Sequence, residues 1–219
     1  TSAQMGAITA TTYYRAVVTS GACTGYSNVV TITVSTTTWN GSAWSNLAPT
    51  ITKAAIFAGN YSSTGDLEAC SVTVQSGTVV FNTGHTLKVQ NAVTVSGGSL
   101  TFEDDASLVQ VANVVNSGNI TYKRITPPIR KFDYVYWSSP VSPQTLFALS
   151  PNTQFDKYYT FDPMIGGWSS ISSSSLMTAA KGYIVRGPNT FDTVVATPYA
   201  ASFVGVPNNG TIAIPIVLG

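Results

Sequence analysis

Three consecutive stretches decide the fold: SVTVQSGTVVFNTGHTLKVQ at residues 71–90, NAVTVSGGSLTFEDDASLVQ at 91–110 and VANVVNSGNITYKR at 111–124. Glycine and aromatic positions recur after 21 and then 20 residues, at Gly77, Gly98 and Gly118 and at Phe81, Phe102 and Tyr122. A fixed period near 20 with short alternating strands is typical of a parallel β-helix, in which each coil buries its apolar face against the next. An antiparallel meander would also alternate, but it would not need these positions to recur in step. The repeat therefore predicts a short β-helix of about three coils.

The low charge of the chain fits such a stack. Only 9% of the 219 residues are charged, against roughly 25% in typical soluble domains. In a stack, outward side chains face one another at about 4.8 Å, so repeated like charges would repel. The 44% of hydrophobic residues argues against disorder. Ten basic and nine acidic residues leave a net charge of +1, so we expect no nucleic-acid partner.

The segments before the repeat have other patterns. Residues 11–34, TTYYRAVVTSGACTGYSNVVTITV, alternate on both sides of a turn and predict an antiparallel hairpin with one buried face. This hairpin resembles the last two strands of an immunoglobulin-like domain, whose other strands would precede residue 1. Residues 35–70 are expected to form a linker and a cap. There Trp39 and Trp44 would cover the open end of the first coil, with sugar binding as the alternative.

After the repeat the composition changes. Four basic residues, Lys123, Arg124, Arg130 and Lys131, surround the pair Pro127-Pro128, which interrupts regular structure and indicates a boundary. The basic residues would solubilise a linker or, alternatively, bind an anionic polysaccharide or a membrane. From Asp133 onward strand patterns follow without a repeat, and an antiparallel β-sandwich-like domain is the simplest packing.

Together these patterns predict an all-β protein with three parts. Residues 1–35 would be the partial immunoglobulin-like hairpin, 36–124 the capped parallel β-helix with its 20–21-residue repeat, and 125–219 the β-sandwich-like domain, whose last strand is expected to continue beyond residue 219. No apolar run approaches the ~18 residues of a membrane-spanning helix, so no membrane span is expected.

The residues that carry most chemistry are scarce. Cys23 and Cys70 are spaced like no metal motif, and His85 is the single histidine, which argues against a zinc site. A disulfide between the two cysteines is one alternative, and a buried thiol at Cys70 is the other. We expect His85 to face solvent at a corner of the first coil. No motif places a nucleophile beside it.

Acidic residues are the other candidates for chemistry. The run Glu103-Asp104-Asp105 falls at an expected corner and lacks the spaced oxygen ligands of a calcium loop, so a solvated corner is the interpretation. A glycoside hydrolase would need two carboxylates about 5 to 10 Å apart, and Asp133, Asp156 and Asp162 are the acids of the aromatic-rich region. Three short coils offer little groove. We therefore predict no enzyme activity, no metal and no cofactor.

Aromatic residues of the C-terminal region are the candidate ligand-binding residues. They are Tyr134, Tyr136, Trp137, Tyr158 and Trp168. Their rings suit stacking on sugars, because an aromatic ring offers an apolar face and, in Tyr and Trp, a polar group. Strand alternation places Tyr134 and Tyr136 on one side of a sheet and Val135 and Trp137 on the other. The alternative is that these rings form an aromatic core.

An ordered series of short motifs adds a resemblance. TWNGSAWSN, SGGSLTFEDDASLVQ, FDYVYWSSPV, KGYIVRGP and FVGVPNNGTI occur in this order within residues 36–219, and the series resembles large secreted cell-surface and adhesin-like proteins of the bacterial type IX secretion system. The resemblance implies location outside a Gram-negative bacterium or on its outer surface, contact with the secretion machinery during export, and adhesion. It supplies no catalytic residue. Asp192-Thr193-Val194 also resembles the O-glycosylation motif of such bacteria, which would make Thr193 a modification site.

These observations lead to a functional prediction. The chain would be a non-catalytic segment of a large secreted bacterial surface protein, acting as a stalk and adhesion module, with surface glycans or other cell-surface proteins as partners. The alternative is a carbohydrate-binding accessory region of a secreted polysaccharide-degrading enzyme.

Overall fold

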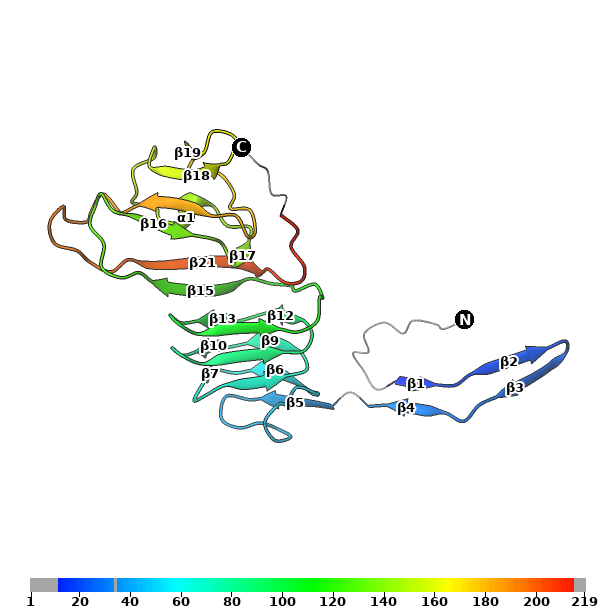
Figure 1. Ribbon diagram of the computed structural model, residues 1–219. Coiled ribbons are helices and arrows are strands. Elements are labelled where there is room, and N and C mark those ends of the chain that lie inside the picture. Colours follow the sequence, from blue (N-terminus) through cyan, green and yellow to red (C-terminus); the bar gives the residue numbers. More distant parts are fainter. Residues whose placement is uncertain (1–11, 34, 215–219) are drawn as a thin grey trace.

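The computed structural model describes residues 12–33 and 35–214 of the chain. The regular secondary structure of these residues is β-strand, apart from one short helix, α1 (Leu146–Leu149). A stack of parallel coils occupies the middle of the molecule, an antiparallel unit lies on one end of it, and a long hairpin extends from the other end (Figure 1). The all-β class, the parallel β-helix and the antiparallel sheets are therefore as predicted from the sequence.

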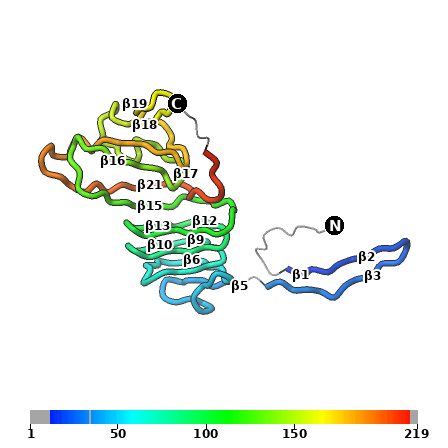
Figure 2. The backbone as a smooth tube through the Cα atoms, in the orientation of Figure 1, coloured from blue at the N-terminus to red at the C-terminus, as the bar shows by residue number. Residues whose placement is uncertain are grey.

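Three parallel sheets form the sides of the solenoid. The first contains, in spatial order, β12 (Val93–Val95), β9 (Val72–Ser76), β6 (Lys53–Ala58) and β5 (Ser35–Trp39). The second contains β13 (Ser99–Phe102), β10 (Thr78–Phe81) and β7 (Tyr61–Ser62). The third contains β14 (Ser107–Gln110), β11 (Thr86–Val89) and β8 (Leu67–Ala69). The chain visits the three sheets in turn and then steps to the next coil (Figure 2).

The register of the coils confirms the repeat. Val72 pairs in parallel with Val93, and Phe81 pairs with Phe102, each 21 residues further along. The solenoid has about four turns, one more than predicted. The extra coil comes from residues 53–69, where β6, β7 and β8 stack below the repeat. Its corners are spaced differently from those of the following coils, so the period of 20–21 residues does not reveal it.

The recurring glycines lie where neighbouring coils approach most closely. Gly77, Gly98 and Gly118 all have positive φ angles, of 84°, 69° and 78°, which L-residues with side chains rarely adopt. A Cβ atom built on Gly98 would lie 2.2 Å from the carbonyl oxygen of Gly77. Glycine therefore recurs at these positions for two reasons: the turn needs a positive φ, and the backbones of neighbouring coils lie too close for a side chain.

The recurring aromatic residues form a ladder inside the solenoid. Phe81 stacks on Phe102 with ring centroids 5.3 Å apart, and Phe102 stacks on Tyr122 at 5.0 Å. Phe81 and Phe102 are fully buried. Below the ladder, Trp44 packs edge-on against Phe57 at 5.3 Å, and Trp39 contacts Trp44 at 5.4 Å. The two tryptophans thus cover the open end of the solenoid, as the capping interpretation predicted, but the coil that they cover is the additional one that contains Phe57.

The antiparallel unit begins on the solenoid itself. Strand β15 (Ile120–Ile125) continues the second solenoid sheet by pairing in parallel with β13, and its other edge pairs antiparallel with β21 (Ala200–Pro207). β17 (Val141–Ser142) pairs with the far edge of β21. Lys123 and Arg124 therefore lie in a strand and not in the linker that the sequence suggested. The Pro127-Pro128 pair follows the end of that strand.

A second antiparallel sheet covers this one. Its order is β16 (Tyr134–Trp137), β20 (Tyr183–Arg186), β18 (Tyr158–Asp162) and β19 (Gly167–Ser170). Trp137 from its inner face packs on Phe203 of β21, with ring centroids 5.8 Å apart. Buried residues of both sheets and of α1 belong to the same hydrophobic core as the solenoid interior. The sandwich and the solenoid are thus joined by one strand and one core.

The N-terminal hairpin is antiparallel as predicted. β1 (Thr12–Tyr14) pairs with β4 (Val30–Ile32), and β2 (Val17–Ser20) pairs with β3 (Cys23–Tyr26). The expected buried face is not buried: Val18 is 68% and Val30 is 61% exposed. The physical reason is that two strands offer no second layer against which to pack.

The glycine corner gives a direct test of the stacking. We expect Gly98→Ala to lower the free energy of unfolding by about 3 kcal/mol or more, because the new Cβ meets a backbone oxygen in addition to the strain of a positive φ. Gly84→Ala is the matched control, since Gly84 has a φ of 79° with nothing within 4 Å of its built Cβ, and we expect a cost of about 1–2 kcal/mol. Denaturant unfolding measures both. Equal losses in the two variants would contradict the close approach.

Candidate functional site

The outer face of the sheet formed by β16, β20, β18 and β19 gathers exposed aromatic side chains. Cross-strand pairing places Tyr136 beside Ile184 and Ile184 beside Tyr159. Residues directly opposite in antiparallel strands lie on the same face. We call this surface the aromatic face and define it by residues Tyr134, Tyr136, Tyr159, Phe161 and Trp168.

The rings of the aromatic face contact one another across the strands. Trp168 lies 5.9 Å from Tyr136 and 5.6 Å from Phe161 between ring centroids, and Tyr134 lies 5.8 Å from Tyr159. Tyr136 is 73%, Phe161 49% and Trp168 40% exposed. Rings held by their neighbours but open on one side are suited to stacking against a flat apolar surface such as that of a sugar ring.

The five candidate ligand-binding residues do not all lie on the same face of the sheet. Tyr134, Tyr136 and Trp168 lie on the aromatic face, and alternation along β16 turns Trp137 inward onto Phe203. Tyr158 is fully buried, and its hydroxyl donates to the carbonyl of Ser150 at 2.6 Å. Three of the five are thus brought together on the surface, Tyr158 belongs to the core, and Trp137 is partly buried against the core.

Two aromatic residues of the face, Tyr159 and Phe161, are not among the five candidate ligand-binding residues. The signal was present in the run YYTFD at residues 158–162, because alternation sends Tyr159 and Phe161 to one side and Tyr158 to the other. Choosing between the sides requires knowledge of which face of β18 covers the core. The sequence alone does not contain that information for a sheet rich in aromatic residues on both faces.

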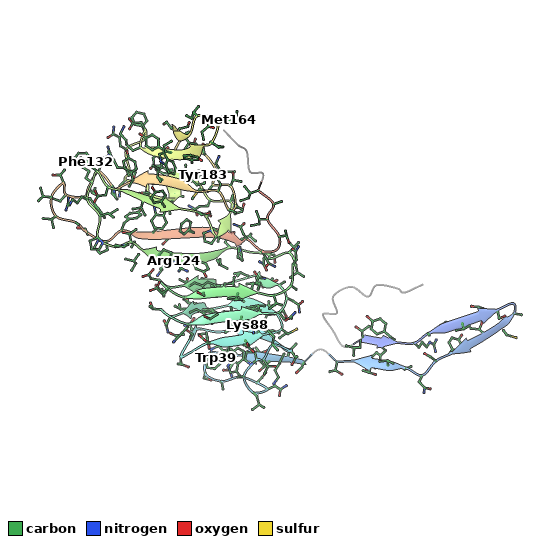
Figure 3. All side chains as sticks on the ribbon, in the orientation of Figure 1. Trp39, Lys88, Arg124, Phe132, Met164 and Tyr183 are labelled. Carbon is green, nitrogen blue, oxygen red and sulfur yellow. The ribbon has the colours of Figure 1, made fainter. Side chains whose placement is uncertain are left out.

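One end of the aromatic face carries charged groups. Arg186, paired with Tyr134 across the strands, is 7% exposed, and its guanidinium carbon lies 5.5 Å from the Phe132 ring centroid. Its Nη2 donates to Gln154 Oε1 at 2.8 Å and to Asn189 Oδ1 at 3.0 Å. The side chain is therefore fixed in place beside the rings. Phe132, which precedes β16 at this end, and Tyr183, which begins β20 at the opposite end beside Trp137, are marked in Figure 3.

An ion pair lies next to this arginine. Lys157 Nζ lies 2.7 Å from Asp156 Oδ2, while Asp156 Oδ1 and Arg186 Nε are buried with no hydrogen-bond partner among the described residues. The hydrogen bond from Lys157 lowers the pKa of Asp156, and the charges of Lys157 and Arg186 act in the same direction against the effect of burial. A depressed pKa means that the stabilisation is present above the ordinary carboxyl pKa of about 4 and is lost as the pH falls through the folded-state value.

The pKa of Tyr134 on the aromatic face is also shifted. Partial burial raises the pKa of Tyr134, and the neighbouring Tyr159 hydroxyl raises it further, while the charges of Arg186 and Lys157 oppose the rise. The Tyr134 hydroxyl is therefore protonated near neutral pH and is available as a donor and acceptor to a ligand.

The other residues considered for chemistry have structural roles. His85 is half-buried, not solvent-facing as expected, and its Nδ1 lies 2.7 Å from Ser63 Oγ on the neighbouring coil. Ser63 is 2% exposed, so a substrate carbonyl could not reach its hydroxyl. The acids of the aromatic-rich region accept local bonds, Asp133 from the Arg130 N–H at 2.7 Å and Asp162 from the Met164 N–H at 3.0 Å.

Cysteines and acidic clusters give no further site in the part of the chain that the structure describes. Cys23 and Cys70 are both free thiols. Residues 12–33 and 35–214 contain no group of three or more His, Cys, Asp or Glu side chains that could hold a metal ion. Within the same residues, no helix has the length and apolarity needed to cross a membrane.

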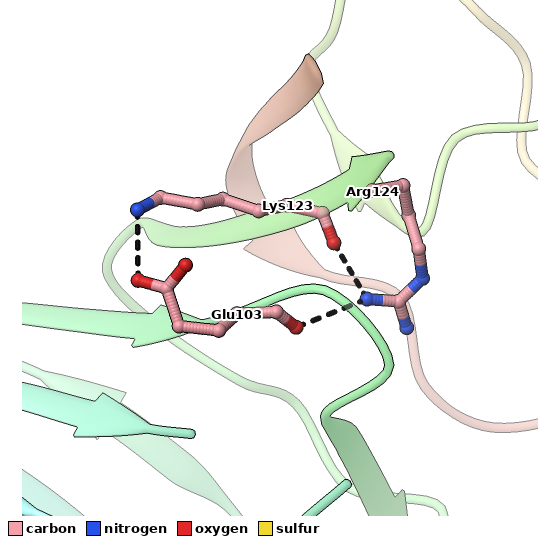
Figure 4. A network of polar contacts seen from close by, with 3 residues as sticks. All are labelled: Glu103, Lys123 and Arg124. Atoms are coloured by element: carbon pink, nitrogen blue, oxygen red, sulfur yellow. Dashed lines mark hydrogen bonds and ion pairs between the residues drawn. The ribbon is translucent and has the colours of Figure 1, made fainter. Parts of the chain in front are cut away.

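The acidic corner is part of a network at the junction of solenoid and sandwich. Lys123 Nζ lies 2.8 Å from Glu103 Oε1, and Arg124 Nη1 donates to the carbonyl oxygens of Lys123 at 2.6 Å and Glu103 at 3.4 Å (Figure 4). Asp104 Oδ1 accepts from the Ile125 N–H at 2.8 Å. Two of the three acids expected to be solvated therefore bind the next strand.

The O-glycosylation candidate lies on an exposed loop. Asp192 Oδ1 accepts from the backbone N–H groups of Val194 at 2.6 Å and Val195 at 2.9 Å. These two bonds lower the pKa of Asp192. They also close a turn around Thr193, which is exposed.

Comparisons with known proteins place the chain in a family. A family model described as "Domain of unknown function (DUF8693)" matches residues 31–219. The chain belongs to this DUF8693 family. A second model, "Domain of unknown function (DUF8696)", matches residues 1–36. Searches of curated proteins and of solved structures found no match. In this DUF8693 chain the aromatic face lies wholly within the region that the family model matches.

The tyrosine pair gives a test of the geometry of the face. We expect Tyr159→Phe to lower the pKa of Tyr134 toward its ordinary value of about 10, because the variant removes the hydroxyl that disfavours ionisation of Tyr134. NMR titration of the tyrosine ring signals measures the change. Tyr136→Phe is the control, since Tyr136 contacts Trp168 and should leave the pKa of Tyr134 unchanged. An identical Tyr134 titration in all three proteins would contradict the pairing.

Proposed function

We propose that this chain is a non-catalytic segment of a large secreted bacterial surface protein, in which the solenoid is a stalk and the sandwich is an adhesion module. The adhesive surface is the aromatic face, and its ligands are surface glycans. One observation carries the proposal: Tyr136, Phe161 and Trp168 form mutual ring contacts while remaining 73%, 49% and 40% exposed. Monomeric proteins rarely expose contiguous apolar surface without a binding role.

The composition of the face supports a sugar ligand over a purely apolar partner. The hydroxyls of Tyr134 and Tyr159 and the ammonium group of Lys157 lie beside the rings. Sugar recognition uses this combination, in which rings stack on the C–H faces and polar groups bind the hydroxyls. A purely apolar interface would instead exclude charged groups from its centre.

The stalk role rests on the solenoid. Each coil adds one layer to a stack held by backbone hydrogen bonds and the aromatic ladder, which gives a rigid spacer. Sparse charge and an exposed Thr193 in the Asp192-Thr193-Val194 motif are in keeping with a secreted, surface-attached protein of a Gram-negative bacterium. In this proposal, export uses the type IX machinery that the sequence motifs suggest.

The aromatic face equally suits a second role, as a carbohydrate-binding accessory region of a secreted polysaccharide-degrading enzyme. The two roles differ in where the glycan is. An adhesion module binds glycans displayed on cells or surfaces, whereas an accessory region binds the polysaccharide that a linked catalytic domain cleaves. Whole-cell binding compared with binding to purified polysaccharides distinguishes them.

Substitution of the face tests the proposal. On a glycan array we expect the unmodified chain to bind a subset of glycans, and Trp168→Ala or Tyr136→Ala to weaken this binding about 3- to 10-fold each, as expected for loss of one aromatic contact. Tyr13→Ala is the matched control, because Tyr13 is 69% exposed but lies on the N-terminal hairpin. Absence of binding to every glycan, or equal weakening by the control, would contradict the proposal.

A further inference from the structure

A pocket of about 260 Å³ lies beside the aromatic face, at the junction of solenoid and sandwich. Its lining residues are Tyr122, Arg124, Tyr136, Trp137, Ser138, Pro140 and Phe203. Tyr136 belongs to both surfaces, so the pocket opens next to the rings of the face. The volume is slightly below the roughly 300–1,000 Å³ of pockets for drug-sized ligands, and it suits a single ring.

Arg124 provides the positive charge of this pocket. Its guanidinium carbon lies 4.5 Å from the Tyr122 ring centroid, and Nη2 donates to the Ala106 carbonyl oxygen at 2.9 Å. Together with the two bonds of Nη1, these contacts hold the guanidinium in one orientation. A guanidinium that is already fixed loses little side-chain entropy when it binds an anion.

The charge of Arg124 has no counter-ion among residues 12–33 and 35–214. The neighbouring carboxylate, Glu103, is paired with Lys123 at 2.8 Å, and Arg124 forms no ion pair within the described residues. The groups that accept its hydrogen bonds are neutral carbonyls. Its three bonds use three of the five N–H groups of a guanidinium. Two N–H groups and one unit of charge are thus left for a ligand.

We propose that this pocket binds one acidic sugar unit, with the ligand carboxylate on Arg124 and the sugar ring against Tyr136 and Trp137. Arginine suits this role because its N–H groups match the two oxygens of a carboxylate. The neighbouring sugar units of the same chain lie on the aromatic face. This inference rests on the proposed function and specifies it: the glycan is an anionic polysaccharide that contains uronic acid.

The experiment measures binding of two matched ligands to the whole chain by calorimetry. One ligand is an oligogalacturonate and the other is the neutral galactose oligomer of the same length. We expect the unmodified chain to bind the acidic oligomer about 10-fold or more tightly than the neutral one, since the ionic hydrogen bonds are made only with the carboxylate. We expect Arg124→Gln to remove this preference while leaving binding of the neutral oligomer largely unchanged.

A second variant distinguishes loss of the pocket from loss of folding. Arg124 also binds solenoid carbonyls, so its substitution can lower stability, which thermal unfolding reports. Ser138→Trp fills the pocket from an exposed position of its lining without touching the bonds of Arg124, and we expect it to remove the acidic preference as well. Ser76→Trp, at an exposed position of β9, is the control and should retain the preference.

The outcomes separate the two levels of the proposal. Binding of neither oligomer by the unmodified chain would overturn the pocket, and it would overturn the glycan-binding function as well only where the glycan array also shows no binding. Equal binding of acidic and neutral oligomers, weakened by Trp168→Ala, would keep the aromatic face and overturn the acidic pocket. Acidic preference that survives in both Arg124→Gln and Ser138→Trp would place the anion elsewhere and would also overturn the pocket.

Discussion

The close approach of backbones at one corner of the solenoid is the constraint on which the rest of the molecule depends. A side chain at Gly98 would collide with the carbonyl of Gly77, so the coils stack at their regular spacing only if glycine returns at every turn. That spacing brings Phe81, Phe102 and Tyr122 into one ladder with nearly parallel rings. The corner therefore sets the position of the last coil, and with it the strand on which the sandwich is built.

Strand β15 connects the stacked coils to the sandwich that carries the proposed binding surface. It pairs with β13 of the solenoid on one edge and with β21 of the sandwich on the other. Three consecutive residues of this strand, Tyr122, Lys123 and Arg124, have different roles. Tyr122 ends the ladder, Lys123 neutralises Glu103, and Arg124 remains charged beside a pocket. Because one strand serves both architectures, the sandwich is held against the solenoid by main-chain hydrogen bonds. A flexible tether would leave the pocket at this junction without fixed walls.

The sequence predicted the solenoid well because its constraint is local and periodic. Gly77, Gly98 and Gly118 each mark the same turn, and the period is visible without any knowledge of distant contacts. The first coil escaped detection because its corner spacing departs from this period. The site was harder to predict, because alternation on β16 separates Tyr136 from Trp137 but does not say which of them faces the core. That choice depends on β21, which follows in sequence only after the whole outer sheet.

The pairing of β15 with β21 also sets an order of folding. Each solenoid coil needs only the coil before it, so the stack can grow in the direction in which the chain emerges. β15 completes its own ladder only when residues 200–207 arrive, and contacts between distant segments form slowly because a long loop must close first. Until then β15 presents a free edge, a known template for unwanted pairing between chains. The end of the solenoid is thus most vulnerable to misassembly during the interval between synthesis of β15 and arrival of β21.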